Sequence, residues 1–435
     1  MQRFLLSVRA VAFATSLSAC SYEVFLSDDS SFPPESDLRD APGEADRPGA
    51  PEGTTVDGDG ADDAPRDVTP SKQLLLAEPS IVQDDTYAFS AMMTRLAGGE
   101  AHAAAFTEAW LRTMAMTRPG AERLLLGPWR TLACPSGYGS SATPCALDLH
   151  DAPFQLLAIV NRIDLAPDAC APGGELRFVY TALDPVTRTP LDATFIFEFP
   201  VRDDAGRVAA AWRALGRLPF GTEYSREVRD LVGELLDGTD PTAAHLRSDE
   251  LSFAPERDAV WELRDFTVQG GPGNRSLVQT ALFDTPVATL DGTPTLAEWV
   301  RGSTRFAPLP TSMRGLTART TTAAFGWTVP EAAEGARLAF SGNTCNGCHG
   351  GDRIVGGVRI AADRLPFQHV APARSVGRYY GESEGSTRVS TYLDSGDGSA
   401  DELGRRAEVL LELATTDCST PPPSGPQYGL RRRDH

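Results

Sequence analysis

The residue pattern with the clearest chemistry is Cys345-Asn346-Gly347-Cys348-His349. Two thiols and an imidazole at this spacing suit covalent attachment of haem c, because both cysteines can add across the vinyl groups while the adjacent histidine binds the iron from one face. Other interpretations are a structural or redox-active disulfide between Cys345 and Cys348, or half of a metal site. No second pair of cysteines or histidines has zinc-ligand spacing, and no βαβ pattern surrounds the motif. The sequence therefore favours one covalent haem c with His349 as an axial iron ligand.

The sequence defines the ligand on the other face of the iron less sharply. A small c-type cytochrome usually takes a methionine from the segment after the motif, but the last methionine of this chain is Met313, which precedes it. The histidines that follow the motif are His369 and the terminal His435. We predict His369 as the second axial ligand. The alternative places His369 in an ordinary loop and leaves the sixth iron position empty or filled from the larger domain.

Another cysteine, Cys20, ends an export signal. Residues 10–19 are apolar but too short to span a bilayer, Arg3 and Arg9 precede them, and Leu17-Ser18-Ala19-Cys20 closes the segment. This pattern is typical of a bacterial lipoprotein signal peptide, residues 1–20, in which acyl chains on the cysteine anchor the mature protein to a membrane. The alternative is an ordinary signal peptide that leaves Cys20 as a plain thiol. We expect a location in the cell envelope, and Ser21 at the position after the cysteine favours the outer membrane.

Four cysteines remain, Cys134, Cys145, Cys170 and Cys418. In an oxidising compartment they most simply form two disulfides, for which three connectivities exist. We favour Cys134 with Cys145, because the Pro-Ser-Gly-Tyr-Gly segment between them has the composition of a loop. That pairing leaves Cys170 to reach Cys418.

The elements that must position these residues indicate an α+β fold. Apolar residues at helical spacing predict helices over Tyr87–Leu96, Ala103–Met116, Arg207–Leu215, Tyr224–Leu236 and Glu331–Phe340, and over a terminal segment that a capping box at Ser399–Glu402 begins and Leu413 ends. Strand-like runs are Phe154–Val160, Leu176–Thr181, Ala193–Phe199, Val260–Val268 and Leu277–Phe283. Because helices and strands do not alternate regularly, we predict a mixed or antiparallel sheet with helices on one side. The alternation in Leu176–Tyr180 suits a sheet with one covered face.

Composition divides the mature chain into three parts. Residues 21–70 hold a net charge of −11 out of −19 for the whole chain and few large apolar residues, so we expect a disordered acidic spacer. Residues 71–325 form the predicted α+β domain. Residues 326–435 form a small, mainly helical haem c domain and a basic tail, because a helix, the haem motif, a long loop and a closing helix resemble a small c-type cytochrome. Lys72 is the only lysine, and no basic face indicates nucleic acid as a partner.

Charged residues flank the end of one predicted strand. Asn161, Arg162 and Asp164 follow an apolar run, and Glu175 and Arg177 begin the next strand. These side chains either hold a ligand or pair with one another across neighbouring strands. We favour ion pairing, because such pairs between strands are common.

Several segments resemble a group of uncharacterised lipoproteins of myxobacteria and their relatives. The likeness covers most of residues 89–393, with gaps. Its segments are 154–165, 174–180, 195–199, 261–266 and the haem-like motif. The resemblance implies an envelope lipoprotein. Its implied cytochrome character rests on the same five motif residues, and the resemblance gives no indication of any particular activity.

Two functions from different classes follow. The first is a lipid-anchored electron carrier whose haem c domain docks on a larger domain that selects a redox partner or small molecule. The second is a non-redox binding or structural lipoprotein of the cell surface in which Cys345 and Cys348 form a disulfide. An enzyme such as a peroxidase would need distal acid and base residues that the sequence does not identify.

The anchoring prediction is tested by changing Cys20 to Ala. The variant should incorporate no labelled palmitate and should not be processed by the lipoprotein peptidase, because the acylated sulfur is gone. Cys134→Ala is the control and should keep the label. Palmitate incorporation that survives Cys20→Ala would rule out lipidation at this residue.

Overall fold

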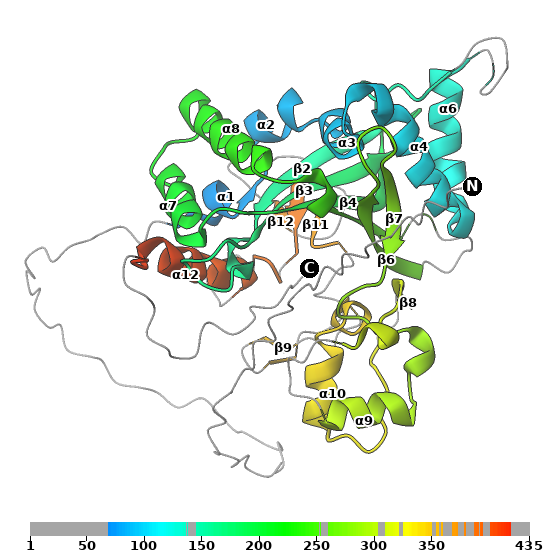
Figure 1. The fold of residues 1–435 in the computed structure, drawn as a ribbon, viewed down its shortest axis with the longest axis vertical. Coiled ribbons are helices and arrows are strands. Elements are labelled where there is room, and N and C mark those ends of the chain that lie inside the picture. The colour runs from blue at the N-terminus through cyan, green and yellow to red at the C-terminus, as the bar shows by residue number, and fades with distance from the viewer. Residues whose placement is uncertain are drawn as a thin grey trace, which may run out of the picture. The chain divides into compact units, whose positions relative to one another are not determined.

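An antiparallel β-sheet organises the part of the chain that the structure describes (Figure 1). The structure is a computed structural model that describes residues 68–135, 137, 145–251, 253, 260–302, 309–321, 325–349, 354–355, 358–359, 368–372, 378–379, 387–390, 392–394 and 401–418. The predicted signal peptide, Cys20, nearly all of the spacer and the basic tail lie outside these residues.

Eight strands of the described residues form this sheet, in the order β1-β2-β3-β4-β5-β6-β7, and β8 also pairs with β6. The strands are β1 (Leu75–Leu76), β2 (Phe154–Asn161), β3 (Glu175–Leu183), β4 (Pro190–Pro200), β5 (His245–Glu250), β6 (Val260–Gln269), β7 (Ser276–Thr280) and β8 (Thr317–Thr321). Every pair is antiparallel. On one side of β6, β8 pairs with its first half and β7 pairs with its second half. The predicted α+β class with an antiparallel sheet is therefore confirmed.

Helices and short strands surround the sheet. The helices are α1 (Pro70–Gln73), α2 (Pro79–Val82), α3 (Phe89–Ala97), α4 (Glu100–Thr117), α5 (Pro119–Ala121), α6 (Gly127–Ala133), α7 (Ala205–Leu215), α8 (Thr222–Asp237), α9 (Pro294–Gly302), α10 (Glu334–Ser341), α11 (Cys345–Gly347) and α12 (Glu402–Thr415). The short strands are β9 (Ile354–Val355), β10 (Val358–Arg359), β11 (Val370–Pro372), β12 (Arg378–Tyr379) and β13 (Thr387–Val389). Helices α3, α4, α7 and α8 confirm the four helices predicted between residues 87 and 236.

Aromatic residues fill the space between α3, α4 and the first face of the sheet. Phe89 of α3 stacks on Phe154 of β2 with ring centroids 3.8 Å apart and meets Tyr180 of β3 edge-on at 5.9 Å. Trp110 of α4 meets Phe195 of β4 edge-on at 5.2 Å. The edge-on contacts are an arrangement that aromatic pairs prefer. The apolar residues at alternate positions of each strand thus face the helices and form the main core.

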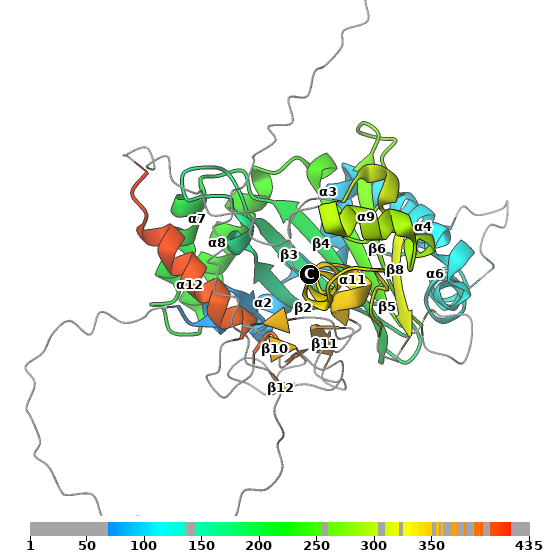
Figure 2. The same ribbon diagram turned by 90° about the horizontal axis from the view of Figure 1, so that it is seen from below.

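The second face of the sheet is also buried, so the prediction of one covered face is wrong. Arg177, which points to this face from β3, is only 4% exposed. Strand β11 packs against β2 and β3, and the Thr387 hydroxyl of β13 donates a hydrogen bond to the Leu157 carbonyl at 2.7 Å. Figure 2 views the molecule from the side where α11, β11 and α12 lie. The alternate polar residues of each strand predicted a face exposed to solvent, but their charges pair with one another beneath C-terminal residues. We call residues 368–372, 387–390, 392–394 and helix α12 the C-terminal cover.

Residues on both sides of the predicted boundary at 325/326 belong to one apolar core. Val370, Leu403 and Leu410 are buried in the same cluster as the strands and helices of residues 74–277. The described residues from 68 to 418 fall within one compact unit. The C-terminal segment therefore covers the sheet and contributes to its core.

Three local predictions need correction. Strand β5 was not predicted, because Leu246 is its only apolar residue. Helix α10 begins at Glu334 rather than at residue 331, since Glu331 has a left-handed backbone with φ of 61° and cannot start a right-handed helix. The N-cap of α12 is Asp401, whose carboxylate accepts a hydrogen bond from the Gly404 N–H at 2.7 Å, whereas the start of the predicted capping box, Ser399, lies outside the described residues.

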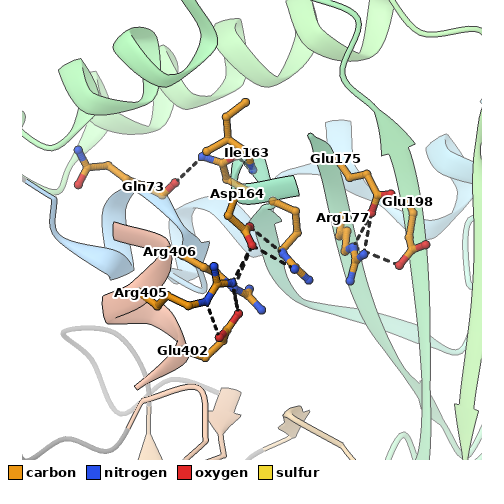
Figure 3. Close-up of polar contacts among 11 residues, drawn as sticks. Gln73, Ile163, Asp164, Glu175, Arg177, Glu198, Glu402, Arg405 and Arg406 are labelled. Atoms are coloured by element: carbon orange, nitrogen blue, oxygen red, sulfur yellow. Dashed lines mark hydrogen bonds and ion pairs between the residues drawn. The ribbon is translucent and has the colours of Figure 1, made fainter. Parts of the chain in front are cut away.

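Helix α12 is fastened by buried ion pairs (Figure 3). Asp164, which follows β2, accepts from Arg162 at 2.9 Å and from Arg405 of α12 at 3.0 Å. Glu402 accepts from Arg405 at 2.6 Å and from Arg406 at 3.0 Å. Burial alone would raise the pKa of Asp164, but the neighbouring guanidinium groups of Arg162 and Arg406 hold it well below its usual value. The carboxylate is therefore ionised wherever the protein is folded near neutral pH.

A second set of ion pairs crosses the same face of the sheet. Arg177 of β3 contacts Glu175 at 2.7 Å and Glu198 of β4 at 3.1 Å, and Arg247 of β5 contacts Glu198 at 3.1 Å. Burial opposes ionisation of Glu175, yet Arg177 and Arg247 lower its pKa to about 2. Charged residues on neighbouring strands are thus joined into ion pairs, as we predicted for Glu175 and Arg177.

Both expected cysteine pairs lie at disulfide distance. The Cα atoms are 6.0 Å apart for Cys134 and Cys145, and 5.3 Å apart for Cys170 and Cys418. The second bridge ties the end of α12 to the turn after β2. Among the described residues, no helix is long and apolar enough to cross a membrane.

The ion pairs of Asp164 predict a large stability effect. Asp164→Asn should lower the free energy of unfolding by about 3–5 kcal/mol in urea denaturation, because it leaves buried arginines without their counter-charge. The difference from wild type should shrink as the pH falls below 3.8, where an aspartate of the unfolded chain takes up a proton and the contribution of the ionised form is lost. Glu234→Gln is the control: it removes an exposed pair with Arg207 and should change stability by less than about 1 kcal/mol. Equal effects of the two changes would contradict a supporting role of Asp164.

Candidate functional site

The haem-like motif forms a short helical turn directly after α10. Helix α10 ends at Ser341 with Gly342 as its C-cap, and the Thr344 hydroxyl caps α11 by accepting a hydrogen bond from the Gly347 N–H at 3.1 Å. Helical spacing places Cys345 and Cys348 on one side of this turn. The local sequence therefore presents both thiols in one direction, as the covalent chemistry of the motif requires.

Contacts from two distant segments hold the turn in place. The Trp327 indole N–H donates to the Thr344 hydroxyl at 2.8 Å and to the Asn346 side-chain oxygen at 3.2 Å. The Cys345 backbone N–H donates to the Thr285 hydroxyl at 3.0 Å. These donors and acceptors are buried, so their hydrogen bonds fix the direction of α11 against the rest of the protein.

The two cysteines of the motif differ in their surroundings. Cys345 is buried against Trp261 and Leu263 of β6 and Ala318 of β8. Burial raises the pKa of the Cys345 thiol to about 12, which keeps it protonated near neutral pH. Cys348 is half-buried, and both residues are thiols in the structure. The attachment side of the motif thus faces the second side of the sheet at β6 and β8.

Four aromatic rings form a row that starts at the sheet. The His349 ring packs on the Trp261 indole with centroids 4.4 Å apart and is 3% exposed. His369 lies next to His349 with centroids 5.1 Å apart, and Tyr392 lies 5.1 Å beyond His369. The Nδ1 atom of His369 is 2.9 Å from the Ser390 hydroxyl oxygen. The structure therefore brings the two predicted axial histidines side by side, although twenty positions separate them in the chain.

A cavity of about 60 Å³ lies between the second face of the sheet and the C-terminal cover. Val179 and Ile196 from the sheet, and Val370 and Leu393 from the cover, make much of its wall apolar. Its polar lining residues are Arg162, Arg177, Thr194, Asp249, His349, His369 and Arg406. The Asp249 carboxylate accepts a hydrogen bond from the Trp261 indole at 2.6 Å, and burial raises its pKa well above the usual value. The cavity combines an apolar wall, two imidazoles and arginines, which are groups that surround a porphyrin with carboxylate substituents.

The histidines that line this cavity, together with the motif cysteines outside its lining, fit haem c in their chemistry. Two thiols on one side of a turn, the adjacent His349 and the facing His369 form the donor set of a haem with two imidazole ligands. A porphyrin is larger than the cavity, so binding would require the residues of the cover to lie farther from the sheet. Within the described residues, no group of three or more His, Cys, Asp and Glu side chains is placed to hold a metal ion.

A second hollow, of about 460 Å³, lies beside α3 and the start of β2. Tyr87, Phe89 and Phe154 form its floor, and Asp85, His150 and Arg188 lie among its lining residues. None of the site residues predicted from the sequence lines it.

Several residues of the site were not given a role from the sequence. Asp249 belongs to the strand β5 that lacked an apolar pattern. Ser390 and Arg406 come from segments whose position depends on docking against the sheet. Trp261 lies in one of the segments that carry the family resemblance, and this resemblance is the one sequence feature that could have marked it as a site residue. Comparison with protein families, with curated protein sequences and with solved structures finds no match for the chain.

The packing of the motif predicts opposite effects for two glycine substitutions. Gly347→Ala would place a methyl group onto the carbonyl oxygen of Ser341 and should destabilise the protein by about 1–3 kcal/mol in urea denaturation. Gly335→Ala, in α10, meets no described atom within 4 Å and should be neutral or stabilising by up to about 1 kcal/mol. The same sign for both variants would show that the turn at 345–349 is not packed as described.

Proposed function

We propose that this protein is a lipid-anchored protein of the bacterial cell envelope that carries one covalent haem c and transfers electrons. The observation that carries the proposal is the position of His349, which directly follows Cys348 in the motif, beside His369 in the lining of one cavity. Haem supplies a centre that gains or loses one electron. A carrier of this kind needs no catalytic acid or base, and we propose none.

Cys345 and Cys348 would hold the haem through two thioether bonds. Each thioether bond would join the cysteine sulfur to one vinyl carbon and place the thiol hydrogen on the other, so the attachment would consume no oxidant. The burial of Cys345 against the sheet supports this role, because it fixes one edge of the binding site. The half-exposed Cys348 lies one helical turn away on the same side.

His349 and His369 would bind the iron from opposite faces. The hydrogen bond between Nδ1 of His369 and Ser390 supports this role, because a partner on one ring nitrogen fixes the ring and leaves Nε2 as the metal ligand. The packing of His349 on Trp261 restricts the rotation of the other imidazole. Two imidazole ligands would give a lower reduction potential than the histidine and methionine pair of many small cytochromes.

The cytochrome-like part of the protein would be the segment after residue 325, held against the sheet. Helices α10, α11 and α12 belong to this segment, and the sheet face between β3 and β6 would close the haem site. Cys20 would anchor the protein to the outer membrane, and the acidic spacer of residues 21–70 would hold the folded part away from the lipid surface. The redox partner would be another envelope protein or a small molecule.

Visible spectroscopy tests the proposal. Protein made in cells that contain the cytochrome c maturation machinery should be red, show a reduced α-band, and keep its colour after extraction with acid acetone. A colourless product would overturn the proposal. If that product also held a disulfide between Cys345 and Cys348, it would support a non-redox binding or structural lipoprotein instead.

The axial ligand is tested separately with His369→Ala. The ferric spectrum should change from six-coordinate low-spin to high-spin, and the ferrous protein should bind carbon monoxide, because one iron ligand is lost. His150→Ala, which changes a histidine of the other hollow, should leave both properties as in wild type. Identical spectra and carbon monoxide binding in wild type and His369→Ala would exclude His369 as a ligand.

A further inference from the structure

We infer that Arg162, Arg177 and Arg406 form a carboxylate-binding end of the cavity, and that they hold the two propionates of haem c. The inference rests on the proposed function and concerns the side of the site that the sequence motif does not define. It follows from where these arginines lie relative to the cysteines, from the donor atoms of Arg177 and Arg406 that point to no described residue, and from the charge around the cavity.

The first observation is the distance across the sheet between the cysteines and the arginines. Cys345 packs on β6 and β8, whereas Arg177 lies on β3, three strands away in the order β3-β4-β5-β6. Three strand spacings are roughly 14 Å. The vinyl and propionate groups of haem lie on opposite edges of the porphyrin. A haem attached at Cys345 and extending along the cavity would therefore direct its propionates toward the arginines.

The second observation is that the arginines come together from separate elements at that end. Arg162 follows β2, Arg177 belongs to β3 and Arg406 belongs to α12, and all three line the cavity. Figure 3 shows Arg406 beside Asp164 and, farther along the sheet, Arg177 between Glu175 and Glu198. All three arginines are at most 4% exposed. They are therefore fixed in position before a ligand binds, which favours recognition of a carboxylate.

The third observation concerns the donors of Arg177 and Arg406. Arg406 uses its Nε atom for Glu402, and Arg177 uses Nε and Nη2 for Glu175 and Glu198. Within the described part of the chain, both terminal nitrogens of Arg406 and the Nη1 atom of Arg177 bond to no residue. A guanidinium group offers five N–H donors in a planar fork, so these atoms can each serve a further carboxylate oxygen.

The charge of the surroundings also favours a further anion. Burial is the main reason why the pKa of Arg177 is below its usual value, and the nearby cations of Arg162 and Arg247 lower it further. The carboxylates of Glu198 and Glu175 offset this effect only in part. Asp249 is the one acidic residue among those that line the cavity, and its register places it four residues along the strands from Arg177, roughly 13 Å away in that direction. No acidic lining residue therefore lies beside the arginines where they face the cavity.

The test compares Arg406→Gln with Arg405→Gln in protein made with the haem c maturation machinery. The two arginines are neighbours on α12 and both pair with Glu402, but only Arg406 lines the cavity, and Arg405 is 39% exposed. Arg406→Gln should lower the midpoint potential, because a cation near the propionates favours the ferrous state. At the wild-type midpoint the ratio of ferrous to ferric haem should fall on the order of tenfold. The propionate bands in resonance Raman spectra should shift as well, and Arg405→Gln should change neither property.

Arg406→Lys provides a second variant that keeps the charge. It should retain a potential close to wild type while the propionate bands shift, because one ammonium group replaces the planar fork. If haem-loaded Arg406→Gln shows the wild-type potential and the wild-type propionate bands, the inference is overturned and the proposed function stays intact. If Arg406→Gln does not fold, unchanged propionate bands in Arg406→Lys have the same meaning. A colourless wild-type protein would overturn the proposed function and this inference with it.

Discussion

The structure depends on the need to pair buried charges on the second face of the sheet. Arg162, Asp164, Arg177 and Glu198 are almost entirely removed from water. A charge in such surroundings is costly unless a charge of opposite sign and hydrogen bonds compensate for it. Asp164 finds part of that compensation in Arg405 and Arg406, which belong to a helix 240 positions later in the chain. The ion pairs therefore select the place where α12 docks.

Docking of α12 has consequences for the rest of the C-terminal segment. With the helix fixed at Asp164 and the Cys170–Cys418 bridge, β11 and β13 lie against β2 and β3 and bring His369 and Ser390 over the sheet. From the other direction, Trp327 and Thr285 hold α11 so that His349 packs on Trp261. The cavity forms where these two parts of the segment meet. Its two histidines are thus positioned by different sets of contacts, although both belong to the same stretch of chain.

This arrangement bears on what a haem at this place would experience. Under our proposal, one wall of the site is a rigid sheet whose charges are already paired, and the other is a cover made of short strands and a helix. Apolar residues of both walls, such as Val179 and Val370, would keep water from the ring and so influence its potential. The cover is the part that would have to adjust to admit the macrocycle, because the sheet is joined by hydrogen bonds and by ion pairs across its strands.

The sequence by itself determined the features that depend on neighbouring residues. Helical periodicity gave α3, α4, α7 and α8, apolar runs gave β2, β3, β4 and β6, and spacing alone distinguished the motif at Cys345–His349. Tertiary structure decided the rest, because burial depends on partners that are distant in the chain. Strand β5 has a polar sequence and is buried only because β4, β6 and the cover supply its partners. For the same reason, no local pattern could show that the polar face of the sheet is covered, or that Arg406 and His369 share one cavity with His349.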